Sequence, residues 1–181
     1  MARRRKARAD DAPAGMSPLS AEAPAPVGRR RAYALLGGEQ RAAWLGDVIE
    51  AGVAGTGRDR YVIDLELQVT ELAPRLAFRK AAFVDIGPVS DPKADTIRLP
   101  ISWQAAGMAP LFPVFSGILR WSDGTLQLDG WYAPPGGSIG MVADRMVLNV
   151  AARATARLLL ERIAAAMCGT ADLGDQGSSS R

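Results

Sequence analysis

Residues 112–132, FPVFSGILRWSDGTLQLDGWY, decide the fold, because they contain two alternating stretches around one short polar turn. Apolar and polar residues alternate on both sides of the turn, as in an antiparallel sheet with one buried face and one face in solvent. Asp123 and Gly124 suit the positive backbone dihedrals that a tight hairpin requires. The stretch therefore predicts a β-hairpin.

Three further segments extend this pattern toward the N-terminus. Residues 61–69 alternate strictly, and their apolar face consists of Tyr61, Ile63, Leu65, Leu67 and Val69. Residues 75–86 and 96–104 predict two more strands. Pro100 donates no backbone hydrogen bond, so we expect its strand to lie at an edge or to carry a bulge. Short links favour pairing of consecutive strands, which gives a meander of about five strands.

After Gly140 the apolar period changes from 2 to 3.6 and holds until about Met167. A polar stripe runs along one side, formed by Arg145, Asn149, Arg153, Arg157 and Glu161. The opposite, apolar side is formed by Val142, Met146, Val150, Leu158, Leu159 and Ile163. A helix of about 27 residues is roughly 40 Å long, enough to cross a sheet. The sequence thus predicts an α+β fold with a long C-terminal helix in the curve of an antiparallel sheet.

The segment before the first predicted strand indicates one short amphipathic helix. Across residues 38–53, apolar side chains recur at spacings of three and four, namely Trp44, Leu45, Val48 and Ile49. The glycines of AGVAGTG then end this helix. Residues 30–36, RRAYALL, offer a short first strand, although their alternation is poor.

Charge is unevenly distributed along the 181 residues. Residues 1–31 hold eight basic and three acidic residues, which leaves 14 basic and 16 acidic residues for the rest. This segment is rich in proline and alanine and poor in large apolar side chains, so we expect a disordered basic tail. It either tethers the protein weakly to an anionic partner or only aids solubility. Residues 169–181 predict a second disordered tail.

Several classes of protein are excluded or disfavoured by composition. Cys168 is the single cysteine, so there is no intrachain disulfide and no cysteine cluster for zinc. The chain has no histidine, which excludes Ser-His-Asp and Cys-His catalysis and histidine metal sites. No cofactor motif is present. No apolar run could span a membrane, and no secretory signal is evident, so we expect a cytoplasmic protein.

The glycine-rich stretch GWYAPPGGSIGMVADRM, residues 130–146, resembles a phosphate loop only superficially. A dinucleotide fingerprint needs GxGxxG after a parallel strand, whereas Gly136, Gly137 and Gly140 form GGxxG after a hairpin. We interpret it as a turn into the C-terminal helix, with Asp144 opposing the positive end of the helix dipole.

Other candidate chemistry is sparse. Asp64 and Glu66 share a strand face, but their alternation with apolar residues marks them as facing solvent. Cys168, in an alanine-rich helix end, is interpreted as packed or incidental rather than as a nucleophile. No catalytic residue and no metal ligand is therefore assigned.

Residues 78–167 resemble the SRPBCC superfamily, the helix-grip fold of START lipid-transfer domains and polyketide cyclases, and most of all its small bacterial members. The likeness rests on RLPISWQAAG, LFPVFSGILRW, LQLDGWYAPPGGSIG and VLNVAARATARLLLERIAAAM, in that order. The resemblance implies a helix-grip domain over residues 32–168, with a sheet of about five to six strands around the helix. Such motifs specify a fold better than an activity.

Our main hypothesis is a domain that binds a hydrophobic small molecule or lipid between sheet and helix. A curved sheet over one helix tends to leave a hollow, and apolar hollows commonly bind apolar molecules. Aromatic residues on these strands could equally fill a solid core. The candidate lining residues each lie on the apolar face of their element: Leu65, Leu67, Trp103, Phe115, Leu128, Tyr132, Met146 and Val150.

Two alternatives remain open from the sequence. One is an enzyme similar to polyketide cyclases or aromatases, in which Tyr132 or Arg120 assists proton transfer. The other is an interaction module with a solid core that works through its basic N-terminal tail.

Overall fold

A computed structural model of the protein describes residues 15–38, 41, 44–45, 48–53, 57–68, 77–91, 93–106, 114–133 and 144–169. The elements, in chain order, are β1 (Ser17–Pro24), α1 (Arg29–Gly37), β2 (Val48–Val53), β3 (Asp59–Gln68), β4 (Ala77–Ile86), β5 (Ile97–Ala105), β6 (Val114–Ser122), β7 (Thr125–Ala133) and α2 (Asp144–Gly169).

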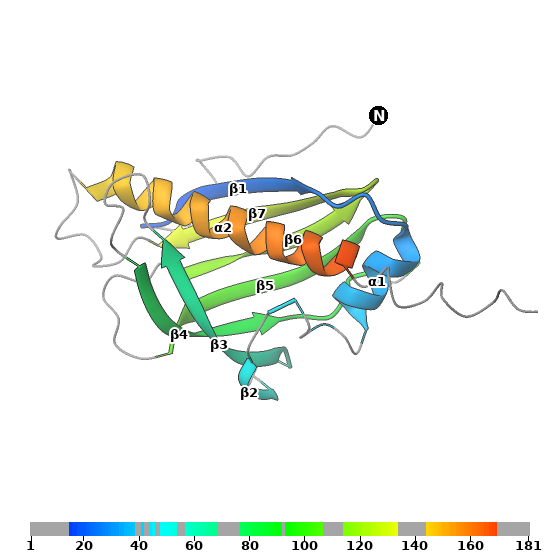
Figure 1. The fold of residues 1–181 in the computed structure, drawn as a ribbon, viewed down its shortest axis with the longest axis horizontal. Helices are drawn as coiled ribbons and strands as arrows, with labels where there is room; N and C mark the ends of the chain where they lie inside the picture. Colours follow the sequence, from blue (N-terminus) through cyan, green and yellow to red (C-terminus); the bar gives the residue numbers. More distant parts are fainter. Residues whose placement is uncertain are drawn as a thin grey trace, which may run out of the picture.

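The strands form one antiparallel sheet in the order β1-β7-β6-β5-β4-β3-β2. The sheet curves, and α2 crosses one of its faces, while α1 lies at the end where α2 finishes (Figure 1). This is the α+β helix-grip architecture expected from the sequence. The sheet has seven strands, slightly more than the five to six that were expected.

The β6–β7 hairpin is confirmed. Ser122 pairs with Thr125, and the two turn residues Asp123 and Gly124 have φ values of 48° and 74°. Two successive positive φ values are what a two-residue hairpin turn of right-handed twist requires. This two-residue turn therefore sets the register of β6 against β7.

Strand β1 corrects the prediction that residues 1–31 are a disordered tail. Residues 17–24 pair along their length with β7, and Leu19 and Ala23 are buried. The apolar alternation of this strand is weak in the sequence because the inward positions of β1 are mostly alanine. Pro18 and Pro24 fit here because β1 is an edge strand, where no outer neighbour needs their missing N–H groups. Residues 1–14 lie outside the described residues.

The elements between β1 and β3 differ from those expected. The helix predicted over residues 38–53 is wrong, because Val48–Val53 form strand β2 and pair with β3. The helix lies earlier, at Arg29–Gly37, where a short strand had been considered. It ends at two glycines, and a Cβ on Gly38 would lie 2.6 Å from the carbonyl oxygen of Ala34. Trp44 and Leu45 are buried between these elements, so apolar spacing reflected burial rather than a helix.

Pro100 lies inside the sheet, which corrects the expectation of an edge or bulge. Its strand β5 runs between β4 and β6. The Pro100 carbonyl accepts a 2.8 Å hydrogen bond from the Gly87 N–H, directly after the end of β4 at Ile86. A Cβ on Gly87 would lie 2.9 Å from the proline ring. Proline is tolerated because the neighbouring strand ends beside it and a glycine makes room.

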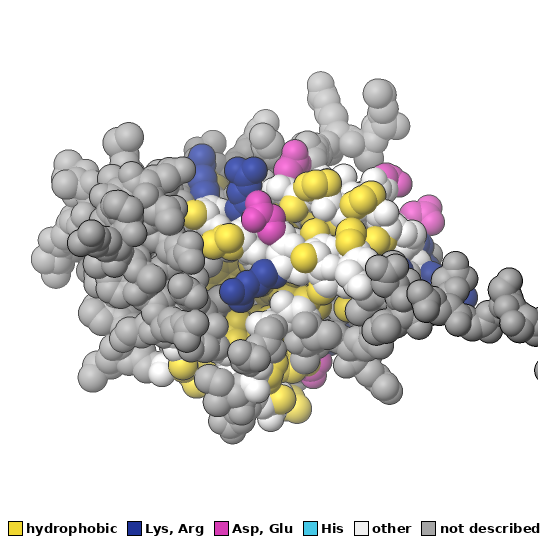
Figure 2. Space-filling model, viewed as in Figure 1, with side chains coloured by type: hydrophobic (Ala, Val, Ile, Leu, Met, Phe, Trp, Pro, Cys, Tyr) yellow, Lys and Arg dark blue, Asp and Glu magenta, His cyan; other side chains and the backbone are white. Residues whose placement is uncertain are grey.

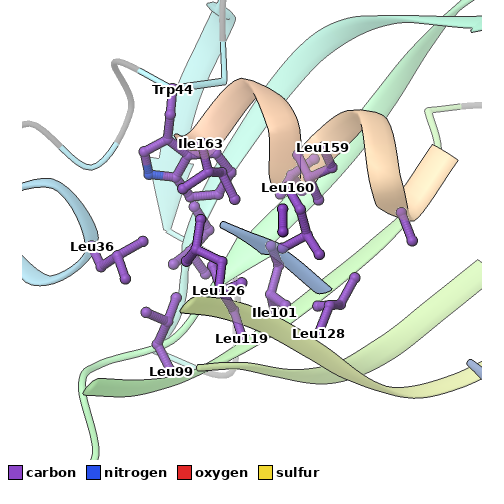
Figure 3. Packing of buried hydrophobic residues seen from close by; sticks show 14 of the residues in the cluster. Leu36, Trp44, Leu99, Ile101, Leu119, Leu126, Leu128, Leu159, Leu160 and Ile163 are labelled. Carbon is purple, nitrogen blue, oxygen red and sulfur yellow. The ribbon is translucent and has the colours of Figure 1, made fainter. Parts of the chain in front are cut away.

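The core lies between the sheet and α2. Helix α2 approaches β1 and β7 most closely and also reaches β3. Its described buried residues are Ala152, Ala156, Leu159, Leu160, Ile163, Ala164 and Met167. Figure 3 shows Leu159, Leu160 and Ile163 pointing toward leucines of the sheet such as Leu126 and Leu128.

Charged side chains lie on the face of the molecule that α2 occupies (Figure 2). On the outward side of α2, Nε of Arg157 lies 3.2 Å from the Glu161 carboxylate. Arg153 is also exposed, so the predicted polar stripe is confirmed where side chains are described. Leu158 had been expected on the buried side, but its exposed fraction is 41%. In the described part of the chain, neither helix has both the length and the apolar character needed to cross a bilayer.

Candidate functional site

Three aromatic residues lie side by side across neighbouring strands on the helix-facing side of the sheet. Tyr132 of β7 pairs with Phe115 of β6, which pairs with Trp103 of β5. All three are buried. They stand at the end of the sheet where β7 finishes and α2 begins (Figure 1). We call these three residues the aromatic row.

The aromatic row contains a close ring stack. The rings of Trp103 and Phe115 lie with centroids 4.0 Å apart and planes 18° from parallel. Stacked rings at this separation are favourable beyond the area that they bury. The register continues from Trp103 to Val84 of β4 and then to Tyr61 of β3. The row thus forms part of a line of large side chains that crosses five strands.

Tyr61 stands at the far end of this line, close to charged groups. Burial raises the pKa of its phenol, and the negative charge of Asp59 raises it further, while Arg41 acts in the opposite direction. Arg41 and Asp59 are themselves paired at 2.7 Å. Tyr61 is therefore held in its neutral form over a wider pH range than a free tyrosine.

A glycine pair separates the aromatic row from the leucines further along the strands. Gly117 and Gly130 face each other on β6 and β7. A Cβ on Gly117 would lie 2.6 Å from Cζ of Phe115, and one on Gly130 would lie 2.8 Å from the same atom. Each added Cβ would also collide with a backbone carbonyl, that of Asp129 or Ser116. The tip of the Phe115 ring occupies the space that the two glycines leave.

The row also contains a buried donor without a partner. In the described part of the chain, the indole nitrogens of Trp103 and Trp44 are buried and make no hydrogen bond. By contrast, the indole N–H of Trp121 donates to the carbonyl of Ala25 at 3.3 Å. Leaving a buried donor unpaired costs about 1–3 kcal/mol, so each such group requires an explanation.

The predicted pocket residues fall into two groups. Trp103, Phe115, Leu128 and Tyr132 are buried on the helix-facing side of the sheet. The other four are placed by backbone only, since their side chains lie outside what the structure describes. Of these, Leu65 and Leu67 pair in register with Lys80 and Phe78, and Met146 and Val150 belong to the first turns of α2. A lining role for the set stays a prediction.

Arg120 belongs to the opposite face of the sheet. It alternates with buried Leu119 and Trp121, and its Nη1 lies 3.8 Å from the carboxylate of Asp129. Asp129 also accepts a 2.7 Å hydrogen bond from Ser20. Of the two residues named in the enzyme alternative, Arg120 therefore lies away from the space between sheet and helix, whereas Tyr132 faces it, and a role for Tyr132 stays a prediction.

Two arginines expected in the basic tail have structural roles. The Nε–H of Arg29 donates to the carbonyl of Ala94 at 2.8 Å. The Nε–H of Arg31 donates to the carbonyl of Met167, in the last turn of α2. Cations are favourable at a helix C-terminus, so Arg31 helps to seat α2. The basic residues before residue 15 lie outside the described residues, and a role for them stays a prediction.

Other sequence candidates give little further chemistry. Among the residues that the structure describes, no group of three or more acidic or cysteine side chains could hold a metal ion. Cys168 is exposed, although it had been interpreted as packed or incidental. The Gly136–Gly140 turn and the side chains of Asp64, Glu66 and Asp144 lie outside what is described.

Comparisons with known proteins give only distant structural similarities. No protein-family model and no curated protein matches it. Solved structures with similar folds include a conserved protein from Geobacillus kaustophilus, with a TM-score of 0.48, 14% identity, and coverage of 86% of this chain and 96% of that one. The structure of Ara h 8.0201 has a TM-score of 0.48 and 12% identity, and the match covers 86% of this chain and 99% of that one.

A third structure is DynU16, a putative protein in the dynemicin biosynthetic locus. Its TM-score is 0.43 at 16% identity, over 87% of this chain. The present chain spans about half of DynU16, 49% of its length.

Proposed function

We propose that this protein binds a small hydrophobic molecule or lipid between the sheet and the first half of α2. The observation that carries the proposal is the position of the aromatic row. Trp103, Phe115 and Tyr132 present large apolar faces toward the helix, at the end where α2 begins. Apolar surfaces with few polar groups are typical of small-molecule sites.

The placement of α2 supports this proposal. Its closest backbone approaches are to β1, β7 and β3, and the middle strands β4, β5 and β6 are not among them. Its first described inward residues are the small Ala152 and Ala156, whereas Leu160 and Ile163 follow in the second half. Small residues on the helix opposite the middle of a curved sheet favour a hollow near the aromatic row.

Residues 78–167 resemble SRPBCC proteins, and members of that superfamily bind apolar ligands. The resemblance therefore agrees with the proposed role. Affinity would come from apolar burial, at about 25 cal/mol per Å² of surface removed from water. The lining would include the eight residues named from the sequence. Arg120 pairs with Asp129 on the other face of the sheet, so a catalytic variant of this proposal would depend on Tyr132.

A filling variant tests the proposal. Ala152→Leu places three more carbon atoms under α2, whereas Arg153→Leu places the same side chain on the exposed side. If the hollow exists, Ala152→Leu folds with little change in melting temperature and loses ligand binding, and Arg153→Leu keeps it. The ligand itself is sought by native mass spectrometry of the intact chain from its own host, followed by organic extraction.

The contrary result is equally clear. In a core without a hollow, Ala152→Leu would be overpacked, and its stability would fall by about 1–3 kcal/mol. Such a fall, together with an apo mass and no response of tryptophan fluorescence to fatty acids, sterols or aromatic polyketides, would refute the proposal.

A further inference from the structure

The orphan donor of Trp103 gives the proposed hollow a chemical preference. Its indole ring is held by the stack on Phe115, and its Nε1 is buried without an acceptor. Trp103 is 4% exposed, so bulk water does not hydrate the group. Native proteins rarely leave such a donor unpaired, and a bound acceptor is a common reason when they do.

The surroundings restrict what that acceptor can be. Among the described residues, no charged or polar side chain is buried in the core. A carboxylate placed beside Trp103 would therefore lose its hydration, and no described core residue would compensate with a positive charge, which is very costly. A neutral oxygen needs only one hydrogen bond, and the indole N–H supplies it.

We infer that Trp103 is the polar anchor of the hollow and that the ligand is an apolar molecule carrying a neutral oxygen acceptor, such as a ketone or ester. This inference rests on the proposed function and deepens it. The ring stack fixes the direction of the N–H, so the ligand oxygen is bound in one orientation while the rest of the molecule lies on apolar surface.

The test uses ligands of one shape that differ in the acceptor. The probes are 2-acetylnaphthalene, its isostere 2-isopropenylnaphthalene and the anion 2-naphthoate, with 2-undecanone and 2-methyl-1-undecene as a linear pair. The intact chain should bind each ketone about tenfold more tightly than its alkene, and more tightly than the anion. Apolar transfer alone would favour the alkene, so the sign of the difference is diagnostic.

Variants assign the preference to one residue. Trp103→Phe should abolish or reverse it, because the donor is lost. Trp121→Phe removes an indole N–H that is already bonded to Ala25, and should leave the preference unchanged. Trp44→Phe removes the other unpaired indole donor, which lies among the aliphatic side chains of Figure 3, and should also leave the preference unchanged.

A measurement on the unaltered protein covers the case in which Trp103→Phe does not fold. The indole proton resonance of Trp103 should move downfield with 2-acetylnaphthalene and not with its alkene, whose ring-current effect is the same. Equal binding of ketones and alkenes would refute this inference and leave the proposed function standing. Absence of binding by all five probes would refute both, and a shift at Trp44 instead of Trp103 would refute the assignment.

Discussion

The two ends of the interface between sheet and helix are built differently. At the end near α1, the second half of α2 presses leucine and isoleucine side chains onto leucines of the sheet, and the Trp121 indole is hydrogen-bonded. At the other end, the sheet presents stacked aromatic rings and one buried N–H without a partner. The first end has the features of a core built for stability, whereas the second has features that a binding site would use.

The largest expected effect lies at the boundary between the two ends. Gly117→Ala should lower the free energy of unfolding by at least about 3 kcal/mol, because the new Cβ collides with the backbone of β7 and the ring of Phe115. Gly52→Ala is the matched control, since a Cβ there meets nothing within 4 Å. Urea denaturation measures both, and equal losses would contradict the close approach of β6 and β7.

At the packed end, Leu160→Ala should cost about 2–5 kcal/mol, because a fully buried side chain is removed and a cavity remains. Leu158→Ala, two positions earlier and 41% exposed, should change stability by about 0.5 kcal/mol or less. Urea denaturation of these two variants tests which side of α2 faces the sheet. Similar losses in the two variants would show that α2 is rotated from the orientation described.

The two ends should also respond differently to the same change in tryptophan. Trp121→Phe loses volume and the hydrogen bond to Ala25, whereas Trp103→Phe loses volume and an N–H that costs stability in the unliganded protein. We expect Trp121→Phe to be the more destabilising by about 1 kcal/mol. Thermal unfolding of both ligand-free variants checks this order, and the reverse order would imply that Trp103 has a partner.

The smallest effect concerns Tyr61, at the far end of the line that contains the aromatic row. Because burial raises its pKa in the folded state, the stability due to the neutral phenol is fully present below about pH 10 and is lost as the pH rises through the higher folded value. Tyr61→Phe should remove this contribution to the loss of folding stability at alkaline pH. The urea midpoints of the original protein and the variant at pH 8 and pH 10.5 measure this contribution. An equal fall in midpoint for both proteins would contradict the raised pKa of Tyr61.

The elements with strong alternation could be predicted from the sequence, and those with weak or misleading periodicity could not. The hairpin of β6 and β7 and the helix α2 have large apolar residues at clear periods, and both were expected. In β1 the inward positions are Leu19, Ala21 and Ala23, and alanine gives little apolar contrast. The apolar spacing from Trp44 to Ile49 did not mark a helix, because Trp44 and Leu45 are buried before strand β2 begins at Val48.

The candidate site shows the same division. That Trp103, Phe115 and Tyr132 lie on one face followed from alternation along their strands, and the structure adds that they are neighbours in register. The unpaired Trp103 N–H could not be predicted, because a missing hydrogen bond depends on the three-dimensional surroundings of the donor. Arg120 lies between the buried Leu119 and Trp121 along β6, so alternation alone places its side chain on the opposite face of the sheet.

Strand β1 also has a consequence for the order of events during synthesis. Ser20 and Asp129 are hydrogen-bonded across β1 and β7 although they are 109 residues apart. At about 5–20 residues per second, the first strand waits roughly 5–20 s for its partner to be made. During that interval β1 and β7 are not yet paired, so the edge of the sheet that α2 packs against has not formed. A recombinant chain begun at residue 32 would lack this edge, because Ser17–Pro24 form the outermost strand of the sheet.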